Sequence, residues 1–374
     1  MITTLDKPEE DFRREVVAFL DGYGPVGGFF HHEGDHEVRI RDLYRALGQR
    51  GWLSLSWPTA VGGMALPPIY EFLLWDEMAY ARAARPPLGS GIVAKTIIAH
   101  GTPDHHERFL PGLRDGTVFF SLGYSEPEAG SDLGRVRMRA VPAGDHYILN
   151  GEKRWTSGGH RADFLWVLCR TGDLESRSRG LSLLIVDRCS PGITISPIPV
   201  LDGGRLNEVR FDDVEVPMAN RVGAEGEAWT IMGEALATER HVQFPPKRVQ
   251  RDFEDLAEWV ASVGLAADPV VRERLAQLRV EVEEAKALAL IMLDAVQHNR
   301  EAAVEAASNK LFGAELCQRI ARAAFEFGAP EAVVRGPMVE FLWRQSICET
   351  IGGGTSEIMR GVISRHLLGL AGSR

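Results

Sequence analysis

The chain has 374 residues, which at about 150 residues per domain indicates two to three folding units. Its 42 Lys and Arg against 52 Asp and Glu give a net charge of −10. This balance argues against nucleic acid and anionic membranes as general partners, because both select basic surfaces. Hydrophobic residues at 45% and charged residues at 25% are ordinary for a globular enzyme and exclude a disordered or collagen-like chain.

The cysteines and the N-terminal residues narrow the class further. The four cysteines lie far apart and form no CxxC pair, so neither a disulfide scaffold nor a four-cysteine zinc site is expected. No run of about 18 apolar residues occurs. The first residues are acidic and polar, without the apolar region of a signal peptide. The sequence therefore predicts a soluble, cytoplasmic protein.

Residues 1–116 are predicted to form an N-terminal helical domain. Asp6 is a suitable N-cap for a first helix. Further helices are expected over 38–47 and 68–84 and, as two shorter segments, around Ile97 and Phe109.

Residues 117–218 have a different pattern, with short β-prone runs separated by Gly, Pro, Asn and Asp clusters. This spacing is typical of an antiparallel sheet or barrel. Helical periodicity returns over 219–374, where Asp268 and Pro269 mark a helix start. One apolar stripe then recurs at steps of three and four residues, at Val271, Leu275, Leu278, Val282, Ala285, Ala289, Met292 and Val296. The predicted fold class is α+β: helices, a middle antiparallel β domain and a C-terminal helical bundle.

Two motif matches are interpreted as accidental. Residues 22–27 match GxGxxG, but a helical pattern precedes them and Pro25 interrupts them, whereas a dinucleotide site needs a preceding strand. Residues 32–36 match HExxH, but Gly34 and the glycines before it make a poor helix, and no clear third ligand lies nearby. A polar loop is the better interpretation, and no metal site is predicted.

Three segments are candidates for carrying chemistry. Residues 121–133 leave a β-prone run and enter a loop of small and hydroxyl residues, suited to a polar ring or a phosphate, although an ordinary hairpin loop fits equally. Residues 150–159 combine a turn with an expected strand start at Trp155, which could be core or could stack on a ligand. Residues 351–358 form a glycine loop before a helix that Thr355 or Ser356 can cap, and a plain hinge remains an alternative.

Together these segments resemble the acyl-CoA dehydrogenase family. YSEPEAGSDL (124–133) looks like its first flavin signature, KRWTS (153–157) like its second, and GGGTSEI (352–358) like its C-terminal signature. Several shorter motifs in the same order are also similar: GW at 51–52, WP at 57–58, GG at 62–63, AHGT at 99–102, NEV at 207–209, FDDV at 211–214 and VP at 216–217. The resemblance therefore covers nearly the whole chain.

The resemblance implies FAD bound between the β domain and the bundle, and oxidation of an acyl thioester to its 2-enoyl product. A carboxylate would remove the α-proton while the β-carbon passes hydride to the flavin N5. The implied cofactor-binding residues are Tyr124, Ser125, Gly130, Trp155, Thr156, Ser157, Thr355, Ser356 and Glu357. Ser131, Gly353, Gly354 and Arg240 are implied on the substrate side, with Arg240 supporting the geometry and not performing chemistry.

The base is where the chain departs from the familiar pattern. Many members carry Glu immediately before the Gly-Thr of the last signature, and this chain has Gly353 there. Isovaleryl-, long-chain and steroid-side-chain enzymes instead place Glu before Arg on a bundle helix, which Glu239 and Arg240 match. Glu239 is therefore the candidate base, with a solvated surface glutamate as the alternative. Such a base needs a pKa raised by an apolar, flavin-covered pocket.

Two other family segments have no clear counterpart. The Arg-x-x-Phe-Gly segment is missing after Arg240, and residues 326–330 replace the usual Gly-Gly-x-Gly. Such losses occur in branches that assemble two different subunits, so the expected assembly is a homo-oligomer (dimer or tetramer) or a heterotetramer. The expected partners are an acyl-CoA or acyl-carrier-protein thioester and an electron-transfer flavoprotein. An oxygen-using oxidase or monooxygenase and a structural partner subunit remain the rival functions.

Overall fold

The computed structural model describes residues 4–27, 35–328 and 330–370, without the side chains of residues 35, 236–240 and 331. The chain divides into two compact units. The helical unit comprises Met1–Phe30, Pro67–Arg85 and Arg240–Arg374, and the sheet unit comprises His31–Leu66 and Pro86–Glu239. These units interleave segments of the chain, and the three boundaries expected from sequence at 1–116, 117–218 and 219–374 stay a prediction.

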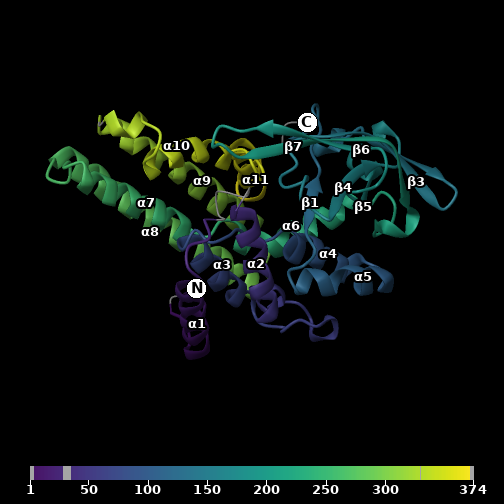
Figure 1. Ribbon diagram of the computed structural model, residues 1–374, viewed down its shortest axis with the longest axis horizontal. Helices are drawn as coiled ribbons and strands as arrows, with labels where there is room; N and C mark the ends of the chain where they lie inside the picture. The colour runs from purple at the N-terminus through teal and green to yellow at the C-terminus, as the bar shows by residue number, and fades with distance from the viewer. Residues whose placement is uncertain (1–3, 28–34, 329, 371–374) are drawn as a thin grey trace. The chain divides into compact units, whose positions relative to one another are not determined.

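The helical unit is built from α-helices whose starts are encoded locally. Its helices are α1 (Lys7–Tyr23), α3 (Pro68–Tyr80), α7 (Pro246–Ser262), α8 (Pro269–Gln297), α9 (Ala303–Glu326), α10 (Met338–Glu349) and α11 (Ser356–His366). The predicted N-caps are confirmed, because Asp6 accepts the Glu9 N–H at 2.9 Å and Asp268 accepts the Val270 N–H at 2.8 Å. Within this unit α7, α8, α9 and α10 pack alongside one another (Figure 1).

The predicted apolar stripe on α8 lies in the core of this bundle. Val271, Leu278, Val282 and Ala285 are buried there with side chains of α7 and α9 such as Leu256 and Ile320. The three-and-four spacing therefore gives one helix face that neighbouring helices cover. Its burial inside the bundle accounts for the stripe without a subunit interface.

The sheet unit surrounds an eight-stranded sheet in the order β6-β7-β3-β2-β4-β5-β8, with β1 pairing β4. The strands are β1 (Phe120–Gly123), β2 (Arg139–Ala143), β3 (His146–Lys153), β4 (Phe164–Arg170), β5 (Leu181–Asp187), β6 (Ile193–Pro199), β7 (Arg205–Pro217) and β8 (Arg221–Val222). The helices are α2 (Asp35–Gln49), α4 (Ala94–His100), α5 (Pro103–Arg114) and α6 (Ala228–Gln243), and the unit boundary falls inside α6 after Glu239.

The sheet is mostly antiparallel, as predicted, but β1 runs parallel to β4. Residues 124–163, including the β2–β3 hairpin, separate these two strands. A parallel pair needs a crossover of a dozen residues or more, and this segment supplies it. The antiparallel pairing expected from sequence therefore holds except for the β1–β4 pair and the single β2–β4 pairing, which are parallel.

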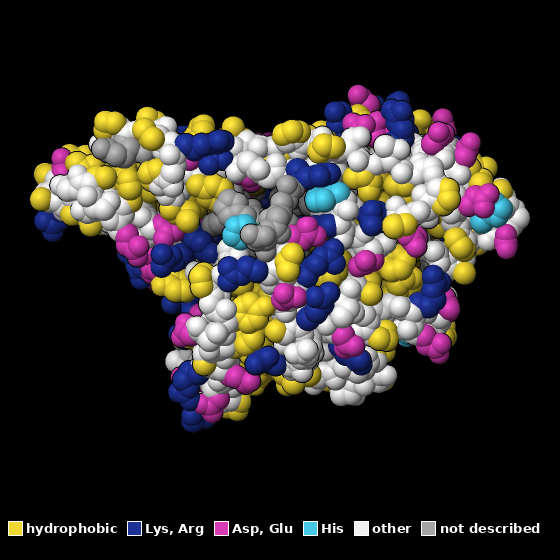
Figure 2. All heavy atoms as spheres, in the orientation of Figure 1, with side chains coloured by type: hydrophobic (Ala, Val, Ile, Leu, Met, Phe, Trp, Pro, Cys, Tyr) yellow, Lys and Arg dark blue, Asp and Glu magenta, His cyan; other side chains and the backbone are white. Residues whose placement is uncertain are grey.

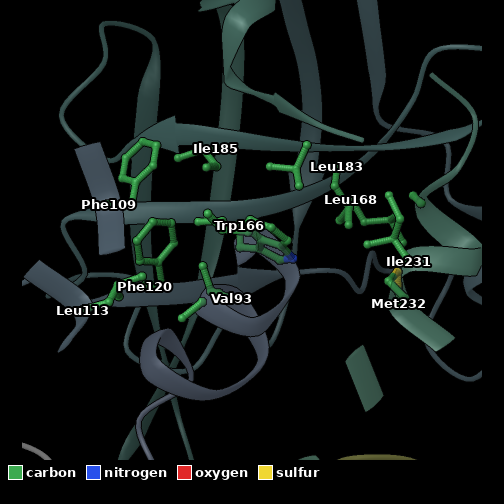
Figure 3. Packing of buried hydrophobic residues seen from close by; sticks show 14 of the residues in the cluster. Val93, Phe109, Leu113, Phe120, Trp166, Leu168, Leu183, Ile185, Ile231 and Met232 are labelled. Carbon is green, nitrogen blue, oxygen red and sulfur yellow. The ribbon is translucent and has the colours of Figure 1, made fainter. Parts of the chain in front are cut away.

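Trp166 lies at the centre of the sheet unit's larger hydrophobic cluster (Figure 3). It is fully buried, and its ring meets Phe120 edge-on with centroids 6.4 Å apart. Ile231 and Met232 of α6 belong to the same cluster. The first turns of α6 are therefore anchored on the sheet by apolar contacts.

Three local expectations are corrected. The helix expected over 68–84 ends at Tyr80, because Arg82 has a positive φ of 50° that a right-handed helix cannot contain. Trp155 does not start a strand, since its φ of 57° is also left-handed. Asn150 and Gly151 lie within β3, where the pairing with β7 shifts register at a bulge, and do not form a turn. Among the described helices, none has the length and apolar character needed to cross a bilayer.

Candidate active site

A buried ion pair fixes the loop that follows β1. The Lys153 ammonium donates to the Tyr124 carbonyl at 3.0 Å and to Oε1 of Glu126 at 2.8 Å. The Glu126 carboxylate also accepts the N–H groups of Arg137 at 2.7 Å and Met138 at 2.9 Å. Burial lowers the pKa of Lys153, and the charge of Glu126 opposes this shift. The end of β3 and the start of the loop are thereby held together.

Tyr124 presents a neutral phenol within this loop. Its hydroxyl accepts a hydrogen bond from the Trp166 indole N–H at 3.1 Å. Burial raises the pKa of Tyr124, so the hydroxyl keeps its proton at physiological pH. The neighbouring Ser125 carbonyl accepts the Arg154 N–H at 2.9 Å, which joins the loop to the segment after β3. Two segments predicted to contact the flavin therefore lie side by side.

The segment after β3 contains a strained, exposed aromatic residue and an unsatisfied hydroxyl. Trp155 has left-handed backbone geometry and is 46% exposed. The buried Asn207 holds the backbone of Thr156, the next residue. The Thr156 N–H donates to the Asn207 carbonyl at 2.9 Å, and the side-chain amide of Asn207 donates to the Thr156 carbonyl at 2.8 Å. Among the described residues the buried Oγ1 of Thr156 has no hydrogen-bond partner. Strain and an unpaired hydroxyl together are typical of a ligand-binding segment.

Ser157 and Ser121 tie the same segment to β1. The Ser121 hydroxyl donates to the Ser157 carbonyl at 2.6 Å. Ser157 itself is exposed, so its side chain faces outward while its backbone is anchored. The structure thus brings Tyr124, Ser125 and the 155–157 segment into one group on the sheet unit.

Gly130 and Ser131 lie on an exposed part of the loop. A Cβ at Gly130 would meet nothing within 4 Å, so packing does not require glycine there. The adjacent Asp132 is held by Arg177, whose Nη2 donates to both carboxylate oxygens at 2.9 and 2.8 Å. The buried Arg170 fixes the underlying backbone by donating to the carbonyls of Gly134, Val136, Asp173 and Arg177 at 2.7–3.0 Å. Ser131 is therefore displayed on a supported loop.

In the helical unit, Thr355 caps α11. Its Oγ1 accepts the Ile358 N–H at 3.2 Å, which confirms the predicted cap. Ser356 is buried, and its hydroxyl has no partner among the described residues. Hydrogen bonds from its own backbone N–H and from the Thr355 hydroxyl lower the pKa of Glu357, which stays anionic. The unpaired Ser356 hydroxyl at the N-terminal end of α11 suits a polar ligand group.

A buried charge cluster anchors the start of the glycine loop. The Glu349 carboxylate contacts Arg248 at 2.7 Å and Arg85 at 2.8 Å, and the Lys310 ammonium donates to the Glu349 carbonyl at 3.0 Å. Burial alone would raise the pKa of Glu349, but the two guanidiniums outweigh it and hold the pKa well below its usual range. No local sequence pattern predicts this cluster, since its members come from four distant segments.

The glycine loop lies beside the end of α6. Gly353 and Gly354 have positive φ values of 68° and 99°, which glycine adopts readily. A Cβ at Gly353 would lie 3.6 Å from Cζ of Phe244, the residue that follows α6. Glu239 and Arg240 lie on α6, but their side chains lie outside the described residues.

Of the two motif matches interpreted as accidental, the structure describes the GxGxxG match fully and the HExxH match only in part. The GxGxxG match follows helix α1, not a strand. Residues 32–34 of the HExxH match lie outside the described residues. In the described part of the chain, no three His, Cys, Asp or Glu side chains are grouped as metal ligands.

Comparisons with known proteins match the chain along nearly its whole length. Family models of the N-terminal, middle and C-terminal domains of acyl-CoA dehydrogenases match residues 7–117, 121–214 and 227–368. The acyl-CoA dehydrogenase FadE26 of Mycobacterium tuberculosis (strain ATCC 25618 / H37Rv) is 32% identical over 98% of this chain and 94% of its own. Two solved structures align over 100% of both chains: the Tcur3481-Tcur3483 steroid ACAD (TM-score 0.91, 28% identity) and the ChsE4-ChsE5 complex from Mycobacterium tuberculosis (TM-score 0.89, 31% identity).

Proposed function

The chain belongs to the acyl-CoA dehydrogenase family, whose flavin-dependent members dehydrogenate acyl thioesters, and we propose its cofactor, its catalytic base and its substrate class on that basis. The proposed cofactor is FAD, and the proposed base is Glu239 on α6. The proposed substrates are acyl-CoA thioesters with branched or bulky acyl groups, and the product is the 2-enoyl thioester.

The observation that supports the choice of base is the position of Gly353 next to Phe244, the residue that follows α6. Gly353 stands where many family members have their glutamate, and it cannot accept a proton. Its missing side chain would point at Phe244, which follows α6 directly and lies five residues after Glu239 in sequence. A carboxylate supplied from α6 can therefore replace one supplied from the loop. The glycine also leaves room for a branched acyl group.

The residues present fit a flavin. The unpaired Thr156 hydroxyl and the neutral Tyr124 phenol supply a donor or acceptor for the polar edge of a ring. The exposed Trp155 offers an apolar face for stacking. The free Ser356 hydroxyl at the α11 N-terminus suits a phosphate. We assign Ser125, Gly130, Ser157, Thr355 and Glu357 to the same cofactor, whose bound form supplies the hydride acceptor for the β-carbon.

The chain's own residues then supply the proton chemistry. Glu239 would take the α-proton onto its carboxylate, and a pKa raised by an apolar site would match this task near neutral pH. Ser131, Gly353 and Gly354 would contact the thioester, with Arg240 supporting the helix. Charge develops on the thioester carbonyl oxygen during this step, so hydrogen-bond donors placed around that oxygen lower the barrier.

Anaerobic titration of the purified flavoprotein with linear, branched and polycyclic acyl-CoA thioesters tests this function. Loss of the oxidised-flavin absorbance with one class establishes dehydrogenation and ranks the substrates. Glu239→Gln should lose bleaching. Glu234→Gln is the matched control, because Glu234 also lies on α6 but is exposed and pairs with His100 at 2.8 Å. Bleaching by Glu239→Gln at the wild-type rate would reject Glu239 as the base.

We further propose that the chain works in a complex with a homologous subunit and passes electrons to an electron-transfer flavoprotein. The similar solved structure of the ChsE4-ChsE5 complex contains two different named components and supports a mixed assembly. Figure 2 shows exposed hydrophobic side chains over the bundle end that carries α10, a surface suited to a partner. Five large hydrophobic residues of α10 and the segment just before it are exposed: Val333, Val334, Met338, Trp343 and Ile347. Mass measurement of the purified protein, alone and with a co-expressed homologue, tests this proposal.

A further inference from the structure

Phe244 occupies an unusual place between a helix end and the glycine loop. It lies between Gln243, the last residue of α6, and Pro245, the N-cap of α7, so it belongs to the short link between two helices. Its ring is half-buried, and its Cζ is the nearest atom to a Cβ placed on Gly353. The ring therefore closes off the space on one side of the glycine loop.

Two neighbouring residues of α9 hold this ring in place. The Asn309 amide donates to the Phe244 carbonyl at 3.3 Å, which fixes the backbone. The Lys310 ammonium lies 5.7 Å from the ring centroid, within cation–π range. Lys310 is itself buried and donates to the Glu349 carbonyl, so it cannot swing away freely. A ring fixed at both backbone and face behaves as a rigid wall.

We propose that Phe244 forms one wall of the acyl site and sets the largest acyl group that fits beside Gly353. The inference rests on the proposed function, because Gly353 and Glu239 place the acyl chain at this loop and helix end. Because Gly353 has no side chain, it leaves space for the acyl group, and the phenyl ring of Phe244 limits the size of that space on the side facing Gly353. Phe244 is therefore a specificity-determining residue.

A change in the side-chain volume of residue 244 should alter the ratio of kcat/KM values between substrates more than it alters the rate of the chemical step. A single methylene in an apolar pocket changes discrimination by about 10- to 200-fold. Phe244→Ala removes the whole phenyl ring and leaves a methyl side chain, so it should favour the bulky substrate by at least about 10-fold. Phe244→Trp should shift the ratio the opposite way by adding volume.

The test compares kcat/KM for butyryl-CoA, isovaleryl-CoA and the CoA thioester of a polycyclic acid, using the flavin-containing enzyme with any partner subunit it needs. Phe312→Ala is the matched control, because Phe312 is also half-buried under a cation, with Arg319 5.3 Å from its ring, but it packs on the bundle core. The polycyclic-to-butyryl ratio should rise in Phe244→Ala, fall in Phe244→Trp and stay within about 2-fold in Phe312→Ala.

If Phe244→Ala does not fold, Phe244→Leu should move the ratio in the same direction by a smaller factor. Unchanged ratios in a folded Phe244 variant that still oxidises butyryl-CoA would overturn the inference and leave the proposed function standing. A wild-type enzyme whose flavin no thioester reduces would instead overturn the proposed function and this inference with it.

Discussion

Replacing Asp76 by Asn should stabilise the helical unit more at pH 8 than at pH 5. Asp76 lies on α3, and its Oδ1 accepts the Lys247 N–H at 2.8 Å in the first turn of α7. The N-cap of α7 is Pro245, which makes no side-chain cap bond, so Asp76 supplies the missing acceptor from another helix. The carboxyl is only 7% exposed and lines a small cavity with Lys247 and Lys286.

Burial raises the pKa of Asp76 from 3.8 to about 7, against the opposing backbone hydrogen bond and the charge of Lys247. The carboxyl is therefore easier to bury protonated than ionised. Its contribution to stability is fully present below the unfolded pKa and is lost as the pH rises through 7. The full shift corresponds to about 4 kcal/mol, and about 2–3 kcal/mol of it falls between pH 5 and pH 8.

Asn keeps the Oδ1 acceptor for the Lys247 N–H and never ionises, so the variant avoids this loss. Thermal unfolding can be followed by the helical circular dichroism signal. The melting temperature of Asp76→Asn minus that of wild type should be about 5–10 °C larger at pH 8 than at pH 5. Asp268→Asn is the control, because Asp268 is likewise an aspartate that accepts backbone N–H groups at a helix start, but it is exposed to solvent. A variant-minus-wild-type difference that is equal at both pH values would refute the reasoning.

Two further predictions concern the sheet unit. Lys153→Met should lower the free energy of unfolding by about 3–5 kcal/mol, because it leaves the Glu126 carboxylate buried without its cation. Urea denaturation measures this loss, adding Glu126→Gln should recover part of it, and a single variant as stable as wild type would contradict the ion-pair account. Thr156→Val should leave stability unchanged but weaken flavin binding by about 2- to 10-fold, because it removes only the unpaired hydroxyl. Flavin-release fluorescence measures this affinity, and unaltered binding would remove Thr156 from the cofactor site.

Features encoded by residues close together in sequence could be predicted. Helix caps join residues two or three positions apart, so Asp6, Asp268 and Thr355 were identified from sequence and are confirmed. The buried stripe of α8 follows from one periodicity and is equally local. The family follows from ordered motifs that span the chain, and the family models confirm it.

Features that depend on distant residues could not be predicted. The Glu349 cluster joins Arg85, Arg248 and Lys310, and no local pattern says which charges will be buried together. The left-handed backbone of Trp155 is stabilised by the hydrogen bonds between the adjacent Thr156 and Asn207, which lies about fifty residues away in sequence. A bulky residue with positive φ is disfavoured locally, so sequence reasoning extended the strand through it.

The most direct test of Glu239 as the base separates proton removal from hydride transfer. The probe is 3,3-dimethylbutyryl-CoA, which has α-hydrogens but none on its β-carbon, so it cannot be dehydrogenated. In D2O the wild-type flavoprotein and Glu234→Gln should exchange its α-hydrogens for deuterium, measured by mass spectrometry. Glu239→Gln should exchange them at least about 100-fold more slowly, because it lacks the general base. Exchange by Glu239→Gln at the wild-type rate would contradict the account.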